Sequence, residues 1–253
     1  MAITVKTSGG GGIKLFIDDV KYKNDLNLQS LILSFEKSTL PYDFYYGSAA
    51  VYNDEIHILG GSDVGSSTKH YVYNGSSWSS ESTLPYDFYY GSAVVYNNGI
   101  HILGGSGNYT KHYSYNGATW TTESTLPYDF YYGSAAVYND EIHILGGSDV
   151  DNTTKHYVYN GSSWSSESTL PYTFYDGSSV LYNDEIHILG SGSIATNHYV
   201  YNGSTWSSES TLPYKFYQGS AVVRNNSINI LGSSNADSKT KHYVIDGTLY
   251  KEV

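Results

Sequence analysis

The chain has 253 residues, a formal net charge of -11 and no cysteine, and 29 of its residues are tyrosine. The absence of cysteine excludes disulfides and thiolate chemistry. Because an acidic protein is repelled by phosphate groups, we expect neither nucleic acid nor an anionic membrane surface as a partner. The sequence has no apolar run of roughly 18 residues, the length of a membrane helix. Its start, MAITVKTSGGGG, lacks the apolar region of a secretory signal.

Residues 1–37 form a leader that does not repeat in the rest of the chain. Residues 13–17 and 26–35 have the apolar content of strands, and the run of glycines before them is typical of a hinge. The leader could supply a strand that closes the following domain, form an edge sheet, or attach the chain to a larger assembly. Residues 248–253 already give the last repeat a final strand, so we favour attachment, with residues 28–35 packed on the domain.

Residues 38–253 contain five repeats, which start near residues 38, 82, 124, 168 and 210. The phrase STLPY occurs once in each repeat. Its prolines lie 44, 42, 44 and 42 positions apart, at Pro41, Pro85, Pro127, Pro171 and Pro213. A fixed period of this size is the signature of a repeat architecture.

Each repeat predicts four short strands and no helix. In the first repeat, the apolar and β-branched runs end at Tyr52, Leu59, Tyr73 and Ser80. Turn signals separate the runs. The Asn74-Gly75 pair is the strongest of them, so we predict a type I′ turn there, with both residues at positive φ. Four antiparallel strands in about 44 residues is the size of one propeller blade.

The repeats therefore predict an all-β fold, a five-bladed β-propeller of four-stranded antiparallel blades, preceded by a short β or extended leader. A single blade cannot bury both of its faces, so neighbouring blades must pack on each other and the ring must close. Gly47, Ser48 and Ala49 are small enough for the crowded inner strand, whereas Trp78 fits the wide outer rim.

Three features recur in the repeat: a double glycine after the second strand, an aromatic residue in the third and a tryptophan in the fourth. In the first repeat they are Gly60-Gly61, Tyr73 and Trp78. With them, the runs SAAVYN, EIHILGG, KHYVYN and SSWSS resemble the kelch repeat family over residues 38–253. The resemblance implies a kelch-like β-propeller. Repeats four and five keep only the first glycine of the pair.

Histidine recurs at two positions of the repeat, which raises the hypothesis of a metal site. The first set is His57, His101, His143 and His187, and the second is His70, His112, His156, His198 and His242. Zinc needs ligands that converge on one point, whereas a residue that occurs once per blade is dispersed around a ring. We therefore predict that the histidines fill positions in the sheets and that no metal site exists.

Paired carboxylates recur after the first strand, as Asp54-Glu55, Asp140-Glu141 and Asp184-Glu185. Such a pair could supply the acid and base of a glycosidase, but adjacent turn residues point in different directions. We interpret these residues as a solvated hairpin turn. The sequence contains no nucleophile elbow, phosphate-binding loop or helical metal motif. We expect no enzyme activity, no catalytic residue and no cofactor.

The loop PYDFYYGS joins the outer strand of one blade to the inner strand of the next, so all copies lie on one face. Its copies differ at two positions, which are Asp43 and Tyr46 in the first repeat. We predict that these positions face solvent and bind a sugar, through tyrosine rings and carboxylates, while the constant aromatic residues pack between blades. The alternative is that the whole loop serves packing. The candidate ligand-binding residues are Asp43, Tyr46, Asp87, Tyr90, Asp129, Tyr132, Thr173, Asp176, Lys215 and Gln218.

The phrase LPYDFYYGSAAVYNDEIHILGG is similar to kelch-type repeats in tail-fibre and tail-tip proteins of phages and prophages of Gram-positive bacteria. The resemblance implies a structural protein of a virion tail or tailocin, made in the bacterial cytoplasm and released by lysis. Its propeller would bind a host cell-surface glycan or receptor, and its leader would bind other tail or baseplate proteins. Similar repeats favour avidity, which a homo-oligomer would multiply.

Three other interpretations stay open at this point. The propeller could be purely structural and dock other proteins. It could be a glycan-active hydrolase like the five-bladed arabinan-cleaving enzymes, which need carboxylates clustered at the axis, where this sequence places small residues. The likeness of the first and third repeats would also fit a designed consensus protein.

Overall fold

The computed structural model describes residues 3–7, 13–17, 39–61, 67–147, 154–192, 196–234, 240–246 and 249–252. The chain divides into two compact units, Met1–Thr39 and Leu40–Val253. In the first unit, β1 (Ile3–Thr7) and β2 (Ile13–Ile17) pair antiparallel. The apolar residues 26–35, and the predicted packing of residues 28–35 on the second unit, lie outside the described residues.

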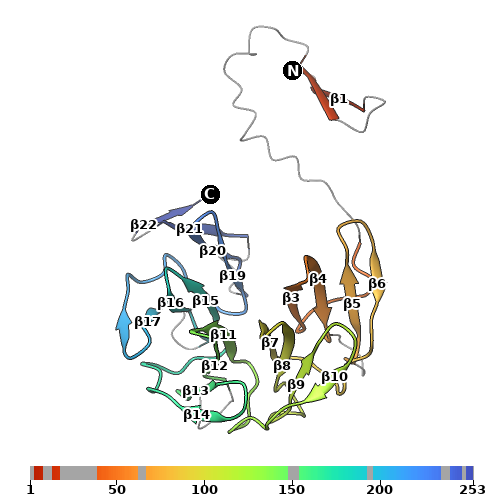
Figure 1. Cartoon of the computed structure of the whole chain (residues 1–253). Helices are drawn as coiled ribbons and strands as arrows, with labels where there is room; N and C mark the ends of the chain where they lie inside the picture. The colour runs from red at the N-terminus through yellow and green to blue at the C-terminus, as the bar shows by residue number, and fades with distance from the viewer. Residues whose placement is uncertain are drawn as a thin grey trace. The chain divides into compact units, whose positions relative to one another are not determined.

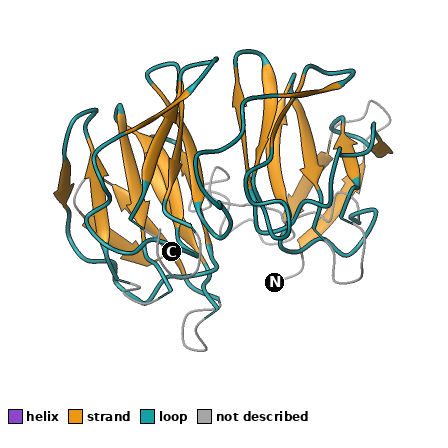
Figure 2. Ribbon diagram, turned by 90° about the horizontal axis from the view of Figure 1, so that it is seen from below, coloured by secondary structure: helices purple, strands orange, loops and turns teal. Residues whose placement is uncertain are grey.

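The second unit is a five-bladed β-propeller, as predicted, and its described residues contain no helix (Figures 1 and 2). Each blade is one antiparallel sheet of four strands in chain order, from the axis outward. The strands of blade 1 are β3 (Ser48–Tyr52), β4 (Glu55–Leu59), β5 (His70–Tyr73) and β6 (Trp78–Ser80). Those of blade 2 are β7 (Ser92–Tyr96), β8 (Gly99–Leu103), β9 (His112–Tyr115) and β10 (Trp120–Thr122).

The remaining three blades repeat this arrangement. Blade 3 contains β11 (Ser134–Tyr138), β12 (Glu141–Leu145), β13 (His156–Tyr159) and β14 (Trp164–Ser166). Blade 4 contains β15 (Ser178–Tyr182), β16 (Glu185–Leu189), β17 (His198–Tyr201) and β18 (Trp206–Ser208). Blade 5 contains β19 (Ser220–Arg224), β20 (Ser227–Leu231), β21 (His242–Asp246) and β22 (Leu249–Glu252).

The tight turn of each blade connects its first and second strands. Asn53 and Asp54 both have positive φ, at 52° and 62°, which is the geometry of a type I′ turn. Asp54 is therefore a turn residue, as predicted. The prediction of a type I′ turn at Asn74-Gly75 is wrong, because only Gly75 has positive φ. That loop has two further residues, and the Asn74 side chain accepts hydrogen bonds from the backbone of Ser76 at 3.0 Å and Ser77 at 3.1 Å.

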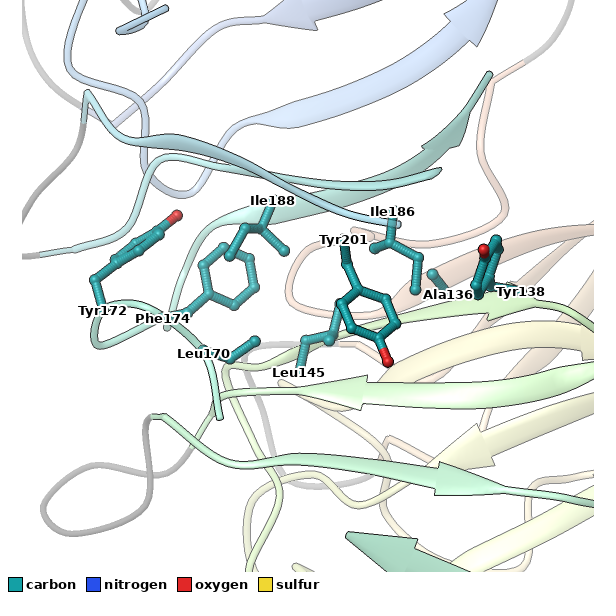
Figure 3. Close-up of a cluster of buried hydrophobic side chains, with 9 residues drawn as sticks. All are labelled: Ala136, Tyr138, Leu145, Leu170, Tyr172, Phe174, Ile186, Ile188 and Tyr201. Carbon is teal, nitrogen blue, oxygen red and sulfur yellow. The ribbon is translucent and has the colours of Figure 1, made fainter. Parts of the chain in front are cut away.

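Apolar clusters between neighbouring blades form the core. Between blades 3 and 4, Phe174 lies beside Ile188, and Tyr201 lies beside Ile186 and Leu145 (Figure 3). Phe88, Phe130, Phe174 and Phe216 occupy the same loop position, and each is fully buried. The prediction that the constant aromatic residues of this loop pack between blades is confirmed for this position.

The double glycine holds the next blade's loop. Gly60 has φ of 62°, and a Cβ on it would lie 1.9 Å from the Phe88 carbonyl oxygen. Gly61 donates its backbone N–H to the same oxygen at 2.8 Å. Only a residue without a side chain can occupy the first position of the pair, and the same close approach at Gly104, Gly146 and Gly190 explains why these repeats keep the glycine.

Candidate functional site

The loops that enter the blades meet at the axis in a belt of backbone hydrogen bonds. The N–H of Tyr90 donates to the carbonyl of Tyr46 at 2.8 Å, and Tyr132 donates to Tyr90 at 2.8 Å. Asp176 donates to Tyr132 at 2.8 Å, and Gln218 to Asp176 at 2.7 Å. All five residues are in the left-handed region, with φ between 53° and 59°. This conformation is costly for residues other than glycine, so the belt fixes the backbone of the site.

These five residues line a pocket of about 390 Å³ at the axis, together with Tyr45 and the glycine that follows each of them. The volume lies within the range of small-molecule sites. The glycines leave space for the loops' own phenylalanines, because a Cβ on Gly47 would lie 2.4 Å from the Phe44 ring.

Three neighbouring tyrosines, whose rings are tilted against one another, form one part of the pocket wall. The ring centroids of Tyr46 and Tyr90 are 4.4 Å apart, and those of Tyr90 and Tyr132 are 4.3 Å apart. Burial raises the pKa of the Tyr90 phenol, and its tyrosine neighbours raise it further. The Tyr90 phenol is therefore neutral at physiological pH, and it can both donate and accept a hydrogen bond.

The other two belt residues that line the pocket, Asp176 and Gln218, have polar side chains. Gln218 Nε2 donates to Asp176 Oδ2 at 3.2 Å. Burial raises the pKa of the Asp176 carboxyl, and the hydrogen bond from Gln218 opposes that change. The pocket therefore combines phenol groups with one carboxylate and one amide, all close to the axis.

The structure separates the ten predicted ligand-binding residues into two sets. Tyr46, Tyr90, Tyr132, Asp176 and Gln218 converge on the pocket. The other set does not line it, and consists of Asp43, Asp87, Asp129, Thr173 and Lys215. Two of them connect loops: Asp87 Oδ1 accepts the backbone N–H of Ser67 at 2.8 Å, and the Thr173 carbonyl accepts the Ser191 hydroxyl at 2.8 Å.

Sequence reasoning places Tyr45 in the packing between blades and so misses its contribution to the pocket. Tyr45 lines the pocket, and its ring meets the Tyr46 ring edge to face at 4.9 Å. A signal was present in the sequence, because every copy of the loop has a tyrosine two positions before the glycine.

The histidines form buried pairs within four blades. Nδ1 of His57 lies 2.8 Å from Nε2 of His70, and the same pair recurs at 2.8 Å in blades 2, 3 and 4. Burial lowers the pKa of His70 to about 4. The prediction that these residues fill sheet positions is confirmed. The described residues contain no group of three or more His, Cys, Asp or Glu side chains arranged to hold a metal ion.

Two comparisons with known proteins identified no relative of this chain. A scan against protein-family models finds no match, and a search of curated proteins finds no significantly similar sequence. Within the part of the chain that the structure describes, no helix is long and apolar enough to cross a membrane.

Proposed function

We propose that the propeller is a binding module whose axial pocket takes a hydroxyl-rich ligand, such as a sugar unit of a host cell-surface glycan. One observation carries the proposal. Five residues from five different blades, three of them tyrosines and the others Asp176 and Gln218, converge on one pocket of about 390 Å³.

The chemistry of the pocket suits a sugar. Tyrosine offers an apolar ring to C–H groups and a hydroxyl to polar groups. The Asp176 carboxylate accepts hydrogen bonds from hydroxyls, and the Gln218 amide can accept and donate. Since the belt of backbone hydrogen bonds fixes all five residues, the site needs little ordering on binding, and preorganisation favours affinity.

The pocket supports binding without hydrolysis. Glycosidases use two carboxyl groups that flank the scissile bond. Asp176 is the single carboxylate among the residues that line the described pocket. We therefore propose a protein without enzymatic activity that holds its ligand and leaves it intact.

We further propose that the protein works in the tail of a phage, prophage or tailocin particle. The similarity of LPYDFYYGSAAVYNDEIHILGG to kelch-type tail repeats supports this setting. In it, residues 1–37 would attach the propeller to tail or baseplate proteins, and the propeller would contact the host surface. Repetition of the propeller in a homo-oligomer would then raise weak site affinities through avidity.

A binding experiment with two matched variants tests the site. Wild-type protein should bind cell-wall polysaccharide of a Gram-positive host, measured by glycan array and isothermal titration calorimetry. Asp176→Asn keeps the shape of the side chain but removes its charge, and Tyr132→Ala removes a pocket ring. Each should weaken binding about tenfold or more. Asp43→Asn should bind as the wild type does, because Asp43 lies in the first copy of the same loop but is exposed and outside the pocket.

Two results would contradict the proposal. Wild-type protein that binds neither the array nor host cells would refute glycan binding. Binding that survives both pocket variants would move the site away from the axis. Release of reducing sugar ends during incubation would instead favour a hydrolase.

A further inference from the structure

Four interfaces between consecutive blades share the same polar contacts. At the first, Tyr90 N–H donates to Tyr46 O, and Ala93 N–H donates to Ser48 Oγ at 3.1 Å. The equivalent serine bond is 3.1 Å at the second and third interfaces and 3.2 Å at the fourth. Blade 5 and blade 1 would form the fifth interface. Within the described residues, neither equivalent bond, from Tyr46 N to Gln218 O or from Ala49 N to Ser220 Oγ, is made.

The apolar side chains of this fifth interface are exposed. Ile56 of blade 1 is 42% exposed, whereas the equivalent isoleucines Ile100, Ile142, Ile186 and Ile228 are fully buried. Leu231 of blade 5 is 37% exposed, whereas Leu59, Leu103, Leu145 and Leu189 are fully buried. A cleft of about 720 Å³ lies between Phe44 on one side and Ser220 and Leu231 on the other.

The space around the glycine in the loop between the third and fourth strands also shows that the fifth interface is open. A Cβ on Gly117, Gly161 or Gly203 would lie within 3.6 Å, 3.1 Å or 2.8 Å of the hydroxyl of a tyrosine in the preceding blade. A Cβ on Gly75, the equivalent residue of blade 1, would meet no atom within 4 Å. The tyrosine position of blade 5 is Arg224, and it lies away from Gly75.

The residue types at this position suggest what closes the interface. Tyr52 donates its hydroxyl to the carbonyl of Asn98 at 2.9 Å, and Tyr182 donates to the carbonyl of Asn226 at 3.1 Å. The acceptor is the second residue of the next blade's type I′ turn. For blade 5 the donor position holds Arg224, which is the only arginine of the chain, and the second turn residue of blade 1 is Asp54. The repeat therefore places a cation opposite a carboxylate at this interface and at no other.

We propose that blade 5 closes on blade 1 and that Arg224 pairs with the Asp54 carboxylate across the closed interface. Closure buries Ile56 and Leu231, and exposed apolar surface of this kind drives it. The charged pair replaces the neutral contact that Tyr52 and Tyr182 make at the first and fourth interfaces. The fifth interface is also the one best suited to reopen, because blade 5 has Arg224 and Asn229 where the other blades have a buried tyrosine and histidine.

Closure would complete the wall of the axial pocket, because Tyr46 and Gln218 are the two ends of the belt and both line the pocket. Closure does not depend on the identity of the ligand, so it can be tested on the full chain without any ligand.

A charge-exchange experiment tests the pair. Arg224→Glu and Asp54→Arg should each lower the melting temperature by about 2–4 °C, the shift that about 1 kcal/mol causes in a domain of this size. The double variant should return to within about 1 °C of the wild type. Arg224→Glu combined with Asp140→Arg is the matched control. Asp140 holds the same turn position in blade 3, where the preceding blade offers Tyr96, so no recovery is expected. Additive losses in the double variant of Arg224 and Asp54 would overturn the proposed pair.

Introduced cysteines test closure directly, because the natural chain has none. Ala93→Cys with Ser48→Cys probes the first interface, where these residues are in contact. Ala49→Cys with Ser220→Cys probes the fifth. Under a mild oxidant both pairs should form a disulfide, detected by mass and by a shift in gel mobility. A disulfide in the first pair and none in the second would refute closure. If neither geometry permits a disulfide, the charge-exchange result decides.

Discussion

Nδ1 of His70 lies 3.3 Å from the carbonyl oxygen of Ser82, while its Nε2 faces Nδ1 of His57 at 2.8 Å. A carbonyl can only accept, so Nδ1 of His70 carries the proton and Nε2 accepts from His57. Nε2 of His57 is then a buried acceptor without a partner among the described residues. Protonation of His70 would place two N–H donors against each other, and protonation of His57 at Nε2 would bury a cation whose new donor has no acceptor among the described residues.

We predict that acid destabilises the propeller between about pH 6.5 and pH 4. Burial lowers the pKa of His112, His143, His156 and His187 to about 4 and that of His198 to about 3. The unfolded chain, with histidine pKa values near 6.5, binds more protons over this range, so stability is complete above it and falls with falling pH. Urea unfolding at pH 7, 6, 5 and 4 should show a midpoint that decreases stepwise. A midpoint that stays constant from pH 7 to pH 4 would contradict the prediction.

Blade 5 provides a natural template for reducing this sensitivity. There, Asn229 Oδ1 lies 3.0 Å from Nε2 of His242, so an amide oxygen takes the place of the first histidine. We predict that His143→Asn makes the pH dependence shallower, since a protonated His156 could donate both to Asn at position 143 and to the Ser168 carbonyl, 3.2 Å from its Nδ1. His143→Leu, which offers no acceptor, is the control. Equal slopes for the two variants would show that the amide does not accept from the imidazolium.

Two glycine substitutions separate the cost of a left-handed backbone from the cost of a steric clash between an added Cβ and the next blade's loop. A Cβ on Gly104 would lie 2.0 Å from the Phe130 carbonyl oxygen, and its φ is 61°. Gly107 has φ of 78°, with nothing within 4 Å of a Cβ. Gly107→Ala should cost about 1 kcal/mol through the left-handed conformation alone. Gly104→Ala should cost well over ~2 kcal/mol, because the blade 3 loop must also move. Denaturant titration of both variants measures the difference, and equal losses would rule out the collision.

A phenol–carboxylate bond connects the outer parts of blades 2 and 3. Tyr159 donates its hydroxyl to Glu123 Oε2 at 2.8 Å, and the Ser114 hydroxyl donates to Oε1 of the same carboxylate at 2.7 Å. Tyr159→Phe should cost about 1.5–3 kcal/mol, the usual net contribution of a hydrogen bond to a charged group. A double-mutant cycle with Glu123→Ala isolates the pair. A coupling energy near zero would mean that the bond does not add to stability.

The strands and the blade number follow from the sequence because both are local and repeated. Alternation within runs such as EIHIL, and the recurring prolines, determine them without knowledge of distant contacts. The buried histidines followed from the same reasoning, since a residue present once per blade takes one sheet position in each. The Asn74-Gly75 turn could not be placed correctly, because loop length and the capping by Asn74 outweigh the preference of the pair for a type I′ turn.

The axial site could be predicted only in part. The two variable positions of the loop were recognised, but their separation depends on the left-handed backbone of Tyr46 and its equivalents. That conformation is stabilised by hydrogen bonds between residues more than 40 positions apart, such as Tyr46 and Tyr90. Asp43 and Tyr46 are near neighbours in sequence, yet only the second reaches the axis, and no local pattern distinguishes them.

Every copy of the repeat contains both the first glycine of the pair and the phenylalanine whose carbonyl oxygen packs against the preceding copy's glycine. Examples of this contact are Gly60 with Phe88 and Gly104 with Phe130. As far as this contact is concerned, any copy can therefore follow any other, and a duplicated copy would bring both halves of the contact. Gain or loss of a whole copy would leave every remaining contact of this kind chemically intact. Recombination between copies could thus change the size of the ring in one event.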